Sequence, residues 1–251
     1  MIDFEELKEN LVYKIINMDI SEYPYPHYAI QDVFPAEVYE LIVKYWPECS
    51  QFQPINETER IEGYSSGQLS SSGKNRLIIS YKKENLESFT NLDSAYFWSR
   101  LRRVLDSAEM ITALLQRTMK YVQAGRPVEN NLKLKSDIIF VQDRKGYFIN
   151  PHTDAPMRYV TTLFYCPDRD DITHLGSSIY IPKDKVGFPY QISSVHLPRE
   201  QFTKIITAPY VPNTLFGFVV GPKSFHGRDL IVDENIERRI ILHMLKKGPT
   251  R

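Results

Sequence analysis

The sequence predicts an α+β protein in which a mainly helical first half flanks a β sandwich or barrel of jelly-roll type. From Leu134 onwards, short runs of β-branched and aromatic residues alternate with clusters of Pro, Gly and Asp. Before that point, apolar residues recur at helical spacing. Nothing resembling a linker separates the two parts. We therefore expect one domain over residues 1–251, with a helical flanking region at 1–130 and a β core at 134–247.

The composition is that of a soluble globular protein. Of 251 residues, 42% are hydrophobic and 25% are charged, and 31 Lys and Arg balance 31 Asp and Glu. No net field therefore favours nucleic acid or an anionic membrane, and no apolar run could span a bilayer. The N-terminus, "MIDFEELKEN", is acidic and amphipathic, unlike a secretory signal. We expect a cytoplasmic protein that binds neither nucleic acid nor membrane, and the sequence leaves its oligomeric state open.

The two cysteines, Cys49 and Cys166, lie too far apart to form a Cys-x-x-Cys redox or metal pair. Two thiols are also too few for a disulfide framework. We expect both to be incidental or buried thiols.

The first part of the chain begins with an extended segment, Pro26 to Phe34, followed by Pro35 at a first helical position. Apolar residues then keep helical spacing until Pro47 ends the pattern. The chain next turns polar, and "SSGQLSSSG", Ser65 to Gly73, has too few apolar side chains to pack. We expect a mobile loop there.

A short strand at Arg76 to Tyr81 leads into two expected helices, at about Asp93 to Leu105 and Ser107 to Ala124. The second has one apolar stripe and ends at the stop signals Gly125 and Pro127.

Seven strand candidates fill the second half of the chain. They are divided by turn signals such as "PDRDD" and "VVGPKS", which is typical of a jelly roll. The candidates are "SDIIFVQD", "GYFINPH", "RYVTTLFYC", "SSIYIP", "KIITAPYV", "TLFGFVV" and "ERRIILHML".

The stretch "INPHTDAP" carries the first candidate for chemistry. Alone it is weak, because a chain with 6 His and 31 acidic residues contains about 0.7 His-x-acid triplets by chance. Alternate side chains of a strand point to the same face, so His152 and Asp154 can do so while Thr153 points away. One strand end could thus supply two metal ligands.

A third ligand is available in "KSFHGRD". His226 follows the strand candidate "TLFGFVV" and lies 226 − 154 = 72 residues after Asp154, enough for strands to cross a barrel and return. Two histidines and one carboxylate on one face leave positions open on a divalent metal, an arrangement that suits non-haem Fe(II) oxygenases.

Two adjacent arginines begin the last strand candidate. Arg238 and Arg239 follow His226 by twelve and thirteen residues, and one of them must point inward if the strand alternates. A guanidinium inside a barrel needs an anionic partner, which a dicarboxylate cosubstrate would provide.

Taken together, "GYFINPHTDAP", "RYVTTLFYCPDRDDITHLGSSIYIP", "PNTLFGF", "SFHG" and the following arginine resemble the Fe(II)- and 2-oxoglutarate-dependent dioxygenases, in particular the prolyl-hydroxylase-like branch. The resemblance covers roughly residues 137–245 and implies a double-stranded β-helix core of jelly-roll or cupin type. "PHYAIQDVFPAEVYELI" is similar to the strand and helix that often precede this core.

The resemblance implies that His152, Asp154 and His226 bind the iron and that an arginine binds 2-oxoglutarate. Where the family begins its last strand with Arg-x-Ser, this chain has Arg238-Arg239-Ile240, which favours Arg238 and leaves Arg239 as a rival. Further expected contacts to the cosubstrate are Tyr147 and either Thr161 or Thr162. Asn213 and Arg228 are weaker candidates, either for supporting the metal ligands or for contacting the substrate.

The activity implied is hydroxylation, with O₂ as cosubstrate and release of succinate and CO₂. Since Asp154 is not a small residue, the resemblance points away from the halogenating relatives. The substrate would be a small molecule, a glycan-linked group or a peptide side chain, which the 183–200 insert could help to enclose. The alternative is a non-catalytic or zinc-binding jelly-roll module. We expect the other histidines to be structural or exposed; they are His27, His174, His196 and His243.

Overall fold

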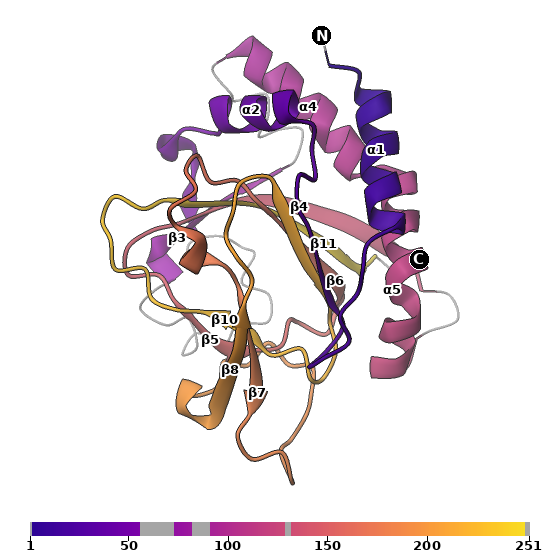
Figure 1. Ribbon diagram of the computed structural model, residues 1–251, viewed down its shortest axis with the longest axis vertical. Helices are drawn as coiled ribbons and strands as arrows, with labels where there is room; N and C mark the ends of the chain where they lie inside the picture. The colour runs from indigo at the N-terminus through magenta and orange to yellow at the C-terminus, as the bar shows by residue number, and fades with distance from the viewer. Residues whose placement is uncertain (1, 56–72, 82–90, 129–131, 249–251) are drawn as a thin grey trace.

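The computed structural model describes residues 2–55, 73–81, 91–128 and 132–248 (Figure 1). Most of the serine-rich stretch expected to be a mobile loop lies outside these described residues.

Two antiparallel sheets form the β part of the molecule (Figure 1). The larger sheet has the order β1 (His27–Ile30), β9 (Thr214–Val219), β6 (Arg158–Tyr165), β11 (Arg238–Lys247), β4 (Leu134–Asp143), β3 (Arg76–Ser80) and β2 (Gln53–Pro54). The smaller sheet has the order β5 (Ile149–His152), β10 (His226–Arg228), β7 (Ser178–Pro182) and β8 (Phe202–Thr207). This arrangement confirms the predicted jelly-roll fold class.

The larger sheet is apolar on both faces because two different layers cover it. Along β4, Ile139 and Val141 pack in the cluster between the two sheets, together with Ile179 of the smaller sheet. The alternate residues Ile138 and Phe140 pack in the cluster under the helices. Because successive side chains of a strand point to opposite faces, the continuous apolar run of β4 contributes to two separate hydrophobic cores.

The α-helices of the described part of the chain cover one face of the larger sheet (Figure 1). They are α1 (Phe4–Ile16), α2 (Ala36–Lys44), α4 (Leu92–Leu105) and α5 (Ala108–Gly125). Single-turn helices lie at Cys49–Gln51, Gly73–Asn75, Thr173–Leu175 and Arg199–Gln201. Within the described ranges, no helix is both long and apolar enough to cross a membrane.

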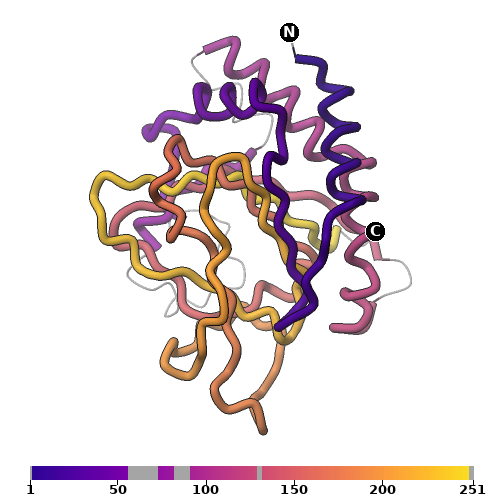
Figure 2. The backbone as a smooth tube through the Cα atoms, in the orientation of Figure 1, coloured from indigo at the N-terminus to yellow at the C-terminus, as the bar shows by residue number. Residues whose placement is uncertain are grey.

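Helix α1 was not among the predicted elements. Its signals are nevertheless local: Asp3 accepts hydrogen bonds from the backbone N–H groups of Glu5 and Glu6, and apolar residues recur every three or four positions. The helix lies beside α5, far away in the sequence, as Figure 2 shows. This contact extends the helical layer.

Strand β10 was also missed, because three residues are too short for a periodic pattern. At its centre, a β-carbon on Gly227 would lie 2.7 Å from the carbonyl oxygen of Ile149 in β5. Only glycine lets the two backbones approach so closely. The close approach holds the flanking residues His226 and Arg228 next to β5.

Candidate metal centre

The three residues predicted to bind metal lie together. His152 ends β5 and is directly opposite His226 in the pairing of β5 with β10, and Asp154 follows two residues later. One ligand atom from each of the three residues lies within 4.8 Å of the others. Within the described part of the chain, this is the one such group of His, Cys, Asp or Glu side chains that could hold an ion.

The backbone fixes both imidazoles in the orientation that metal binding needs. His152 Nδ1 lies 2.9 Å from the carbonyl oxygen of Asn150, and His226 Nδ1 lies 3.0 Å from that of Ser224. Because a carbonyl oxygen only accepts, Nδ1 carries the proton in each ring. The Nε2 lone pair of each ring is then available to a metal ion, and the carbonyl holds the ring in place.

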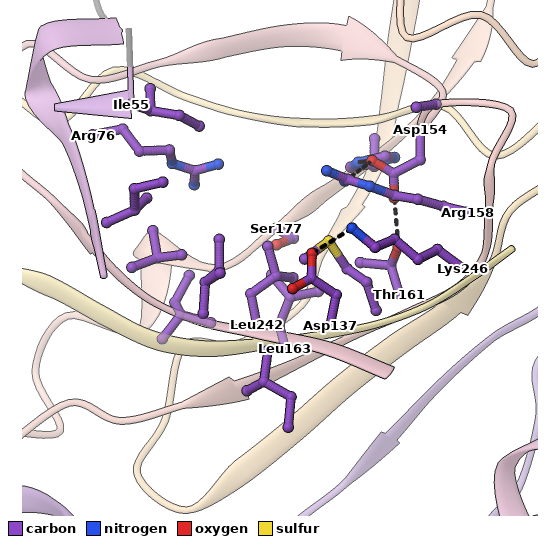
Figure 3. Close-up of a pocket in the computed structure, with 18 of the residues that line it drawn as sticks. Ile55, Arg76, Asp137, Asp154, Arg158, Thr161, Leu163, Ser177, Leu242 and Lys246 are labelled. Atoms are coloured by element: carbon purple, nitrogen blue, oxygen red, sulfur yellow. Dashed lines mark hydrogen bonds and ion pairs between the residues drawn. The ribbon is translucent and has the colours of Figure 1, made fainter. Parts of the chain in front are cut away.

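Asp154 is buried, and hydrogen-bond donors hold both its carboxylate oxygens (Figure 3). Arg158 Nη1 donates to Oδ1 at 2.8 Å, and Thr161 Oγ1 donates to Oδ2 at 2.5 Å. Burial alone would raise the pKa of Asp154, but Arg158 and the two histidines outweigh it and hold this pKa well below its usual range. The carboxylate is therefore ionised.

Burial, together with the neighbouring His226 and His196, lowers the pKa of His152 well below 6.5. Burial also lowers the pKa of His226. Both rings are therefore neutral near pH 7 and can act as ligands. We call this group of His152, Asp154 and His226 the metal end of the site.

A cavity of about 480 Å³ extends from the metal end between the two sheets. Figure 3 shows Arg76 on the side of the cavity opposite Asp154 and Arg158. Arg228 and Arg238 line the same cavity. We call the group of Arg76, Arg228, Arg238 and the adjacent Asp143 the arginine end.

Asp143 is the carboxylate of the arginine end. It is fully buried and accepts two hydrogen bonds from Arg76, at 2.7 and 2.9 Å, and one from Arg238 at 2.9 Å. Burial would raise the pKa of Asp143, but the charges of Arg76, Arg238 and Arg228 hold it below its usual value.

Of the two arginines that begin β11, Arg238 points into the molecule. It is 1% exposed, whereas Arg239 is directed outward, where it forms ion pairs with Asp168 at 3.0 Å and Glu237 at 3.3 Å. The inward guanidinium of Arg238 already has protein partners in Asp143, Leu175 and Ser177.

The other expected cosubstrate contacts divide between the cavity and the surrounding core. Thr161 lines the cavity and binds Asp154, while Thr162 points to the opposite face and pairs with the hydroxyl of Tyr28 at 3.1 Å. Tyr147 is buried, with the guanidinium of Arg76 4.3 Å from its ring centre. Asn213 is not at the cavity, because its amide binds the backbone of Phe34.

The structure adds a residue that the sequence did not indicate. The ring of His196 lies 4.6 Å from that of His152, centre to centre, although we expected His196 to be structural or exposed. It belongs to the 183–200 insert, which is attached beside the metal end: Thr153 Oγ1 donates to the carbonyl of Gln191 at 3.1 Å and accepts from the N–H of Ser193 at 3.0 Å. A contact between residues so far apart in the sequence produces no periodic sequence pattern from which it could be predicted.

Comparison with known proteins gave structural similarity only. No family model matches the chain, and no curated protein matches its sequence. A prolyl hydroxylase from Trichoplax adhaerens, solved with a peptide fragment of a hypoxia-inducible factor, is similar with 12% identity and a TM-score of 0.52 over 97% of this chain and 90% of that one. This similarity supports the predicted prolyl-hydroxylase-like fold.

Two further solved structures are similar at lower scores. A prolyl-4-hydroxylase from Pseudomonas putida has a TM-score of 0.49 and 12% identity over 96% of this chain and all of that one. The dioxygenase for auxin oxidation 1 from Arabidopsis thaliana, solved with 2-oxoglutarate, has a TM-score of 0.47 and 11% identity over 99% of this chain and 91% of that one.

Proposed function

We propose that the protein is an Fe(II)- and 2-oxoglutarate-dependent dioxygenase that hydroxylates a small molecule, a glycan-linked group or a peptide side chain. The observation that carries this proposal is one cavity whose two ends suit ligands of opposite charge. Two neutral imidazoles and a carboxylate at one end suit a divalent cation, and clustered guanidiniums at the other suit an anion. A keto acid with a distal carboxylate matches both ends.

The donor set of the metal end fits Fe(II). His152 and His226 present Nε2, and Asp154 presents an ionised carboxylate, so His152, Asp154 and His226 would hold the ion. Three protein ligands on one side leave positions for cosubstrate and O₂. When bound, iron and 2-oxoglutarate supply the oxidation chemistry, with succinate and CO₂ as by-products.

The protein's own contribution is positioning. Carbonyl oxygens orient the two rings, while Thr161 and Arg158 orient the Asp154 carboxylate. The apolar side chains Leu163, Phe218 and Leu242 also line the cavity and limit the access of water to it. The 183–200 insert brings His196 beside the metal end, where it would face a bound substrate.

The proposal is tested by anaerobic titration of the purified protein with Fe(II) and then 2-oxoglutarate. We expect a weak visible metal-to-ligand charge-transfer band that saturates with 2-oxoglutarate. A protein that binds Fe(II) but develops no band at saturating 2-oxoglutarate would contradict the proposal. Preferential binding of zinc with no keto acid bound would support a zinc-binding module instead.

The substrate class is tested separately by incubating the iron-loaded protein with 2-oxoglutarate, O₂ and a panel of metabolites, sugars and peptides. Succinate formation that rises above the substrate-free rate identifies a substrate. A panel member that raises succinate without itself gaining oxygen, measured by mass spectrometry, would indicate an oxidative outcome other than hydroxylation.

A further inference from the structure

We infer that Arg228, which lies on β10 with His226, is the residue that holds the distal carboxylate of 2-oxoglutarate. Arg238 serves to position this end of the cavity. The inference rests on the proposed function and changes the assignment that the sequence favoured. Four observations support it.

The first observation is that protein groups already occupy Arg238. Its Nη1 donates to Asp143 at 2.9 Å, its Nε to the carbonyl of Leu175 at 2.5 Å, and its Nη2 to the hydroxyl of Ser177 at 3.4 Å. Three of its five N–H groups are thus engaged, and an incoming carboxylate that displaced Asp143 would leave this buried carboxylate without one of its two arginine partners. Such a loss is costly inside a protein.

The second observation is that Arg228 has unused donors. Its Nη1 donates to the carbonyl of Asp229 at 2.6 Å, but its Nε and Nη2 are buried and have no hydrogen-bond partner among the described residues. The side chain is 3% exposed and lines the cavity. Buried donors are rarely left unsatisfied, and Nε with Nη2 is one edge of the guanidinium fork that binds a carboxylate bidentately.

The third observation is the charge balance. The guanidiniums of Arg76, Arg228 and Arg238 lie around the carboxylate of Asp143, which forms ion pairs with Arg76 and Arg238. Arg76, Arg228 and Arg238 line one cavity, and their like charges repel one another. An anionic ligand would relieve this repulsion.

The fourth observation is position. Arg228 lies two residues after His226 on β10, a separation of about 6.6 Å along a strand. This separation is comparable with the length of a five-carbon dicarboxylate that is bound to the metal through its keto acid end. The backbone at this position is fixed, because Arg199 Nη2 donates to the carbonyl of Arg228 at 2.7 Å, while Arg199 Nη1 pairs with Asp229.

The test compares two keto acids that differ only at the distal end. 2-Oxopentanoate has a methyl group where 2-oxoglutarate has its distal carboxylate. Binding of each to the Fe(II)-loaded protein is measured anaerobically by calorimetry, for the parent protein and for Arg228→Met, Arg238→Lys and Arg239→Met. The outward-facing Arg239 provides the matched control, as an arginine on the same sheet outside the cavity lining.

We expect Arg228→Met to weaken 2-oxoglutarate binding by about 10- to 100-fold, the effect of losing hydrogen bonds to a charged group, and 2-oxopentanoate binding by less than about threefold. Arg239→Met should leave the ratio of the two affinities within about threefold of the parent, and Arg238→Lys should lower this ratio by less than Arg228→Met does. Fe(II) affinity and the thermal midpoint are measured for each variant. If Arg228→Met does not fold, Arg228→Lys replaces it, with an expected loss of about tenfold for 2-oxoglutarate only.

Equal 2-oxoglutarate affinities in the parent and Arg228→Met would overturn the inference, as would a selective loss in Arg238→Lys alone. In both cases the parent still binds 2-oxoglutarate more tightly than 2-oxopentanoate, so the proposed function stands. A parent protein that binds Fe(II) but neither keto acid would remove the proposed function and, with it, this inference.

Discussion

The two ends of the cavity differ in how completely the protein satisfies its own polar groups. At the metal end, each histidine donates from Nδ1 to a carbonyl, and both oxygens of Asp154 have donors. At the arginine end, Asp143 accepts hydrogen bonds from two guanidiniums, while Nε and Nη2 of Arg228 have no hydrogen-bond partner among the described residues. At the metal end, hydrogen bonds within the protein already orient the candidate metal ligands. At the arginine end, two N–H donors of Arg228 remain available to a ligand.

This difference teaches that the two ends need ligands of opposite charge. Neutral imidazoles with a carboxylate stabilise a cation, whereas an excess of buried guanidiniums stabilises an anion. A keto acid with a distal carboxylate could contact both ends at once, and binding at one end would then favour binding at the other. The following predictions test each end, from the largest expected effect to the smallest.

The largest effect is expected from Asp143→Asn at the arginine end. This change removes the carboxylate that forms ion pairs with both Arg76 and Arg238, and breaking a buried ion pair costs about 3–5 kcal/mol. Chemical denaturation should show that decrease in the free energy of unfolding. The control is Asp137→Asn, which affects the less buried pair with Lys246 and should cost less than about 1 kcal/mol. Similar decreases in the free energy of unfolding for both variants would mean that the ion pairs of Asp143 stabilise the protein no more than the pair of Asp137 with Lys246.

The next effect is expected from Asp154→Asn at the metal end. The amide keeps the shape of the side chain but removes the negative charge, so Fe(II) affinity should fall by more than about 100-fold, beyond the effect of losing a residue that only supports a ligand. Calorimetric titration with Fe(II) under argon measures it. Retention of affinity within tenfold would show that the ion binds elsewhere.

A smaller effect is expected from Thr161→Val, which removes the hydroxyl that donates to Asp154 Oδ2. Loss of such a supporting hydrogen bond lowers metal affinity by about 10- to 100-fold. The matched control is Thr162→Val, since Thr162 is the next residue of β6 but pairs with Tyr28 on the opposite face. Equal metal affinities for the two variants would exclude a role for Thr161 in orienting the carboxylate.

The smallest effect is expected from pH. Protons compete with the metal for Nε2, and two histidines of ordinary pKa, about 6.5, would weaken metal binding about tenfold between pH 7 and pH 6. Burial lowers the pKa of His152 well below 6.5, so this ring stays neutral over the range, and burial also lowers the pKa of His226, so that ring gains fewer protons than an ordinary histidine. Fe(II) affinity should therefore change by less than about threefold. A tenfold change would place these pKa values near 6.5.

Much of the fold followed from the sequence because its signals are local. Runs of β-branched and aromatic residues between turn signals predicted β4 and β6, and apolar spacing with stop signals predicted α5. The elements that were not predicted had weak or overlooked local signals: β10 has three residues, and α1 depends on a cap at Asp3. For β10 the missing information was the strand against which it pairs, whereas α1 has local signals.

For the site, the sequence by itself predicted three candidate metal ligands from spacing and residue type, a His-x-Asp pair on a strand and a later histidine, and the folded chain brings these side chains together. It also narrowed the inward arginine of β11 to Arg238 or Arg239. Only the tertiary structure decided that Arg238 is engaged by Asp143, that Arg228 has unused donors, and that His196 lies beside His152. The physical reason is that spacing fixes which face a side chain points to, whereas its partner is chosen by segments that meet only after folding.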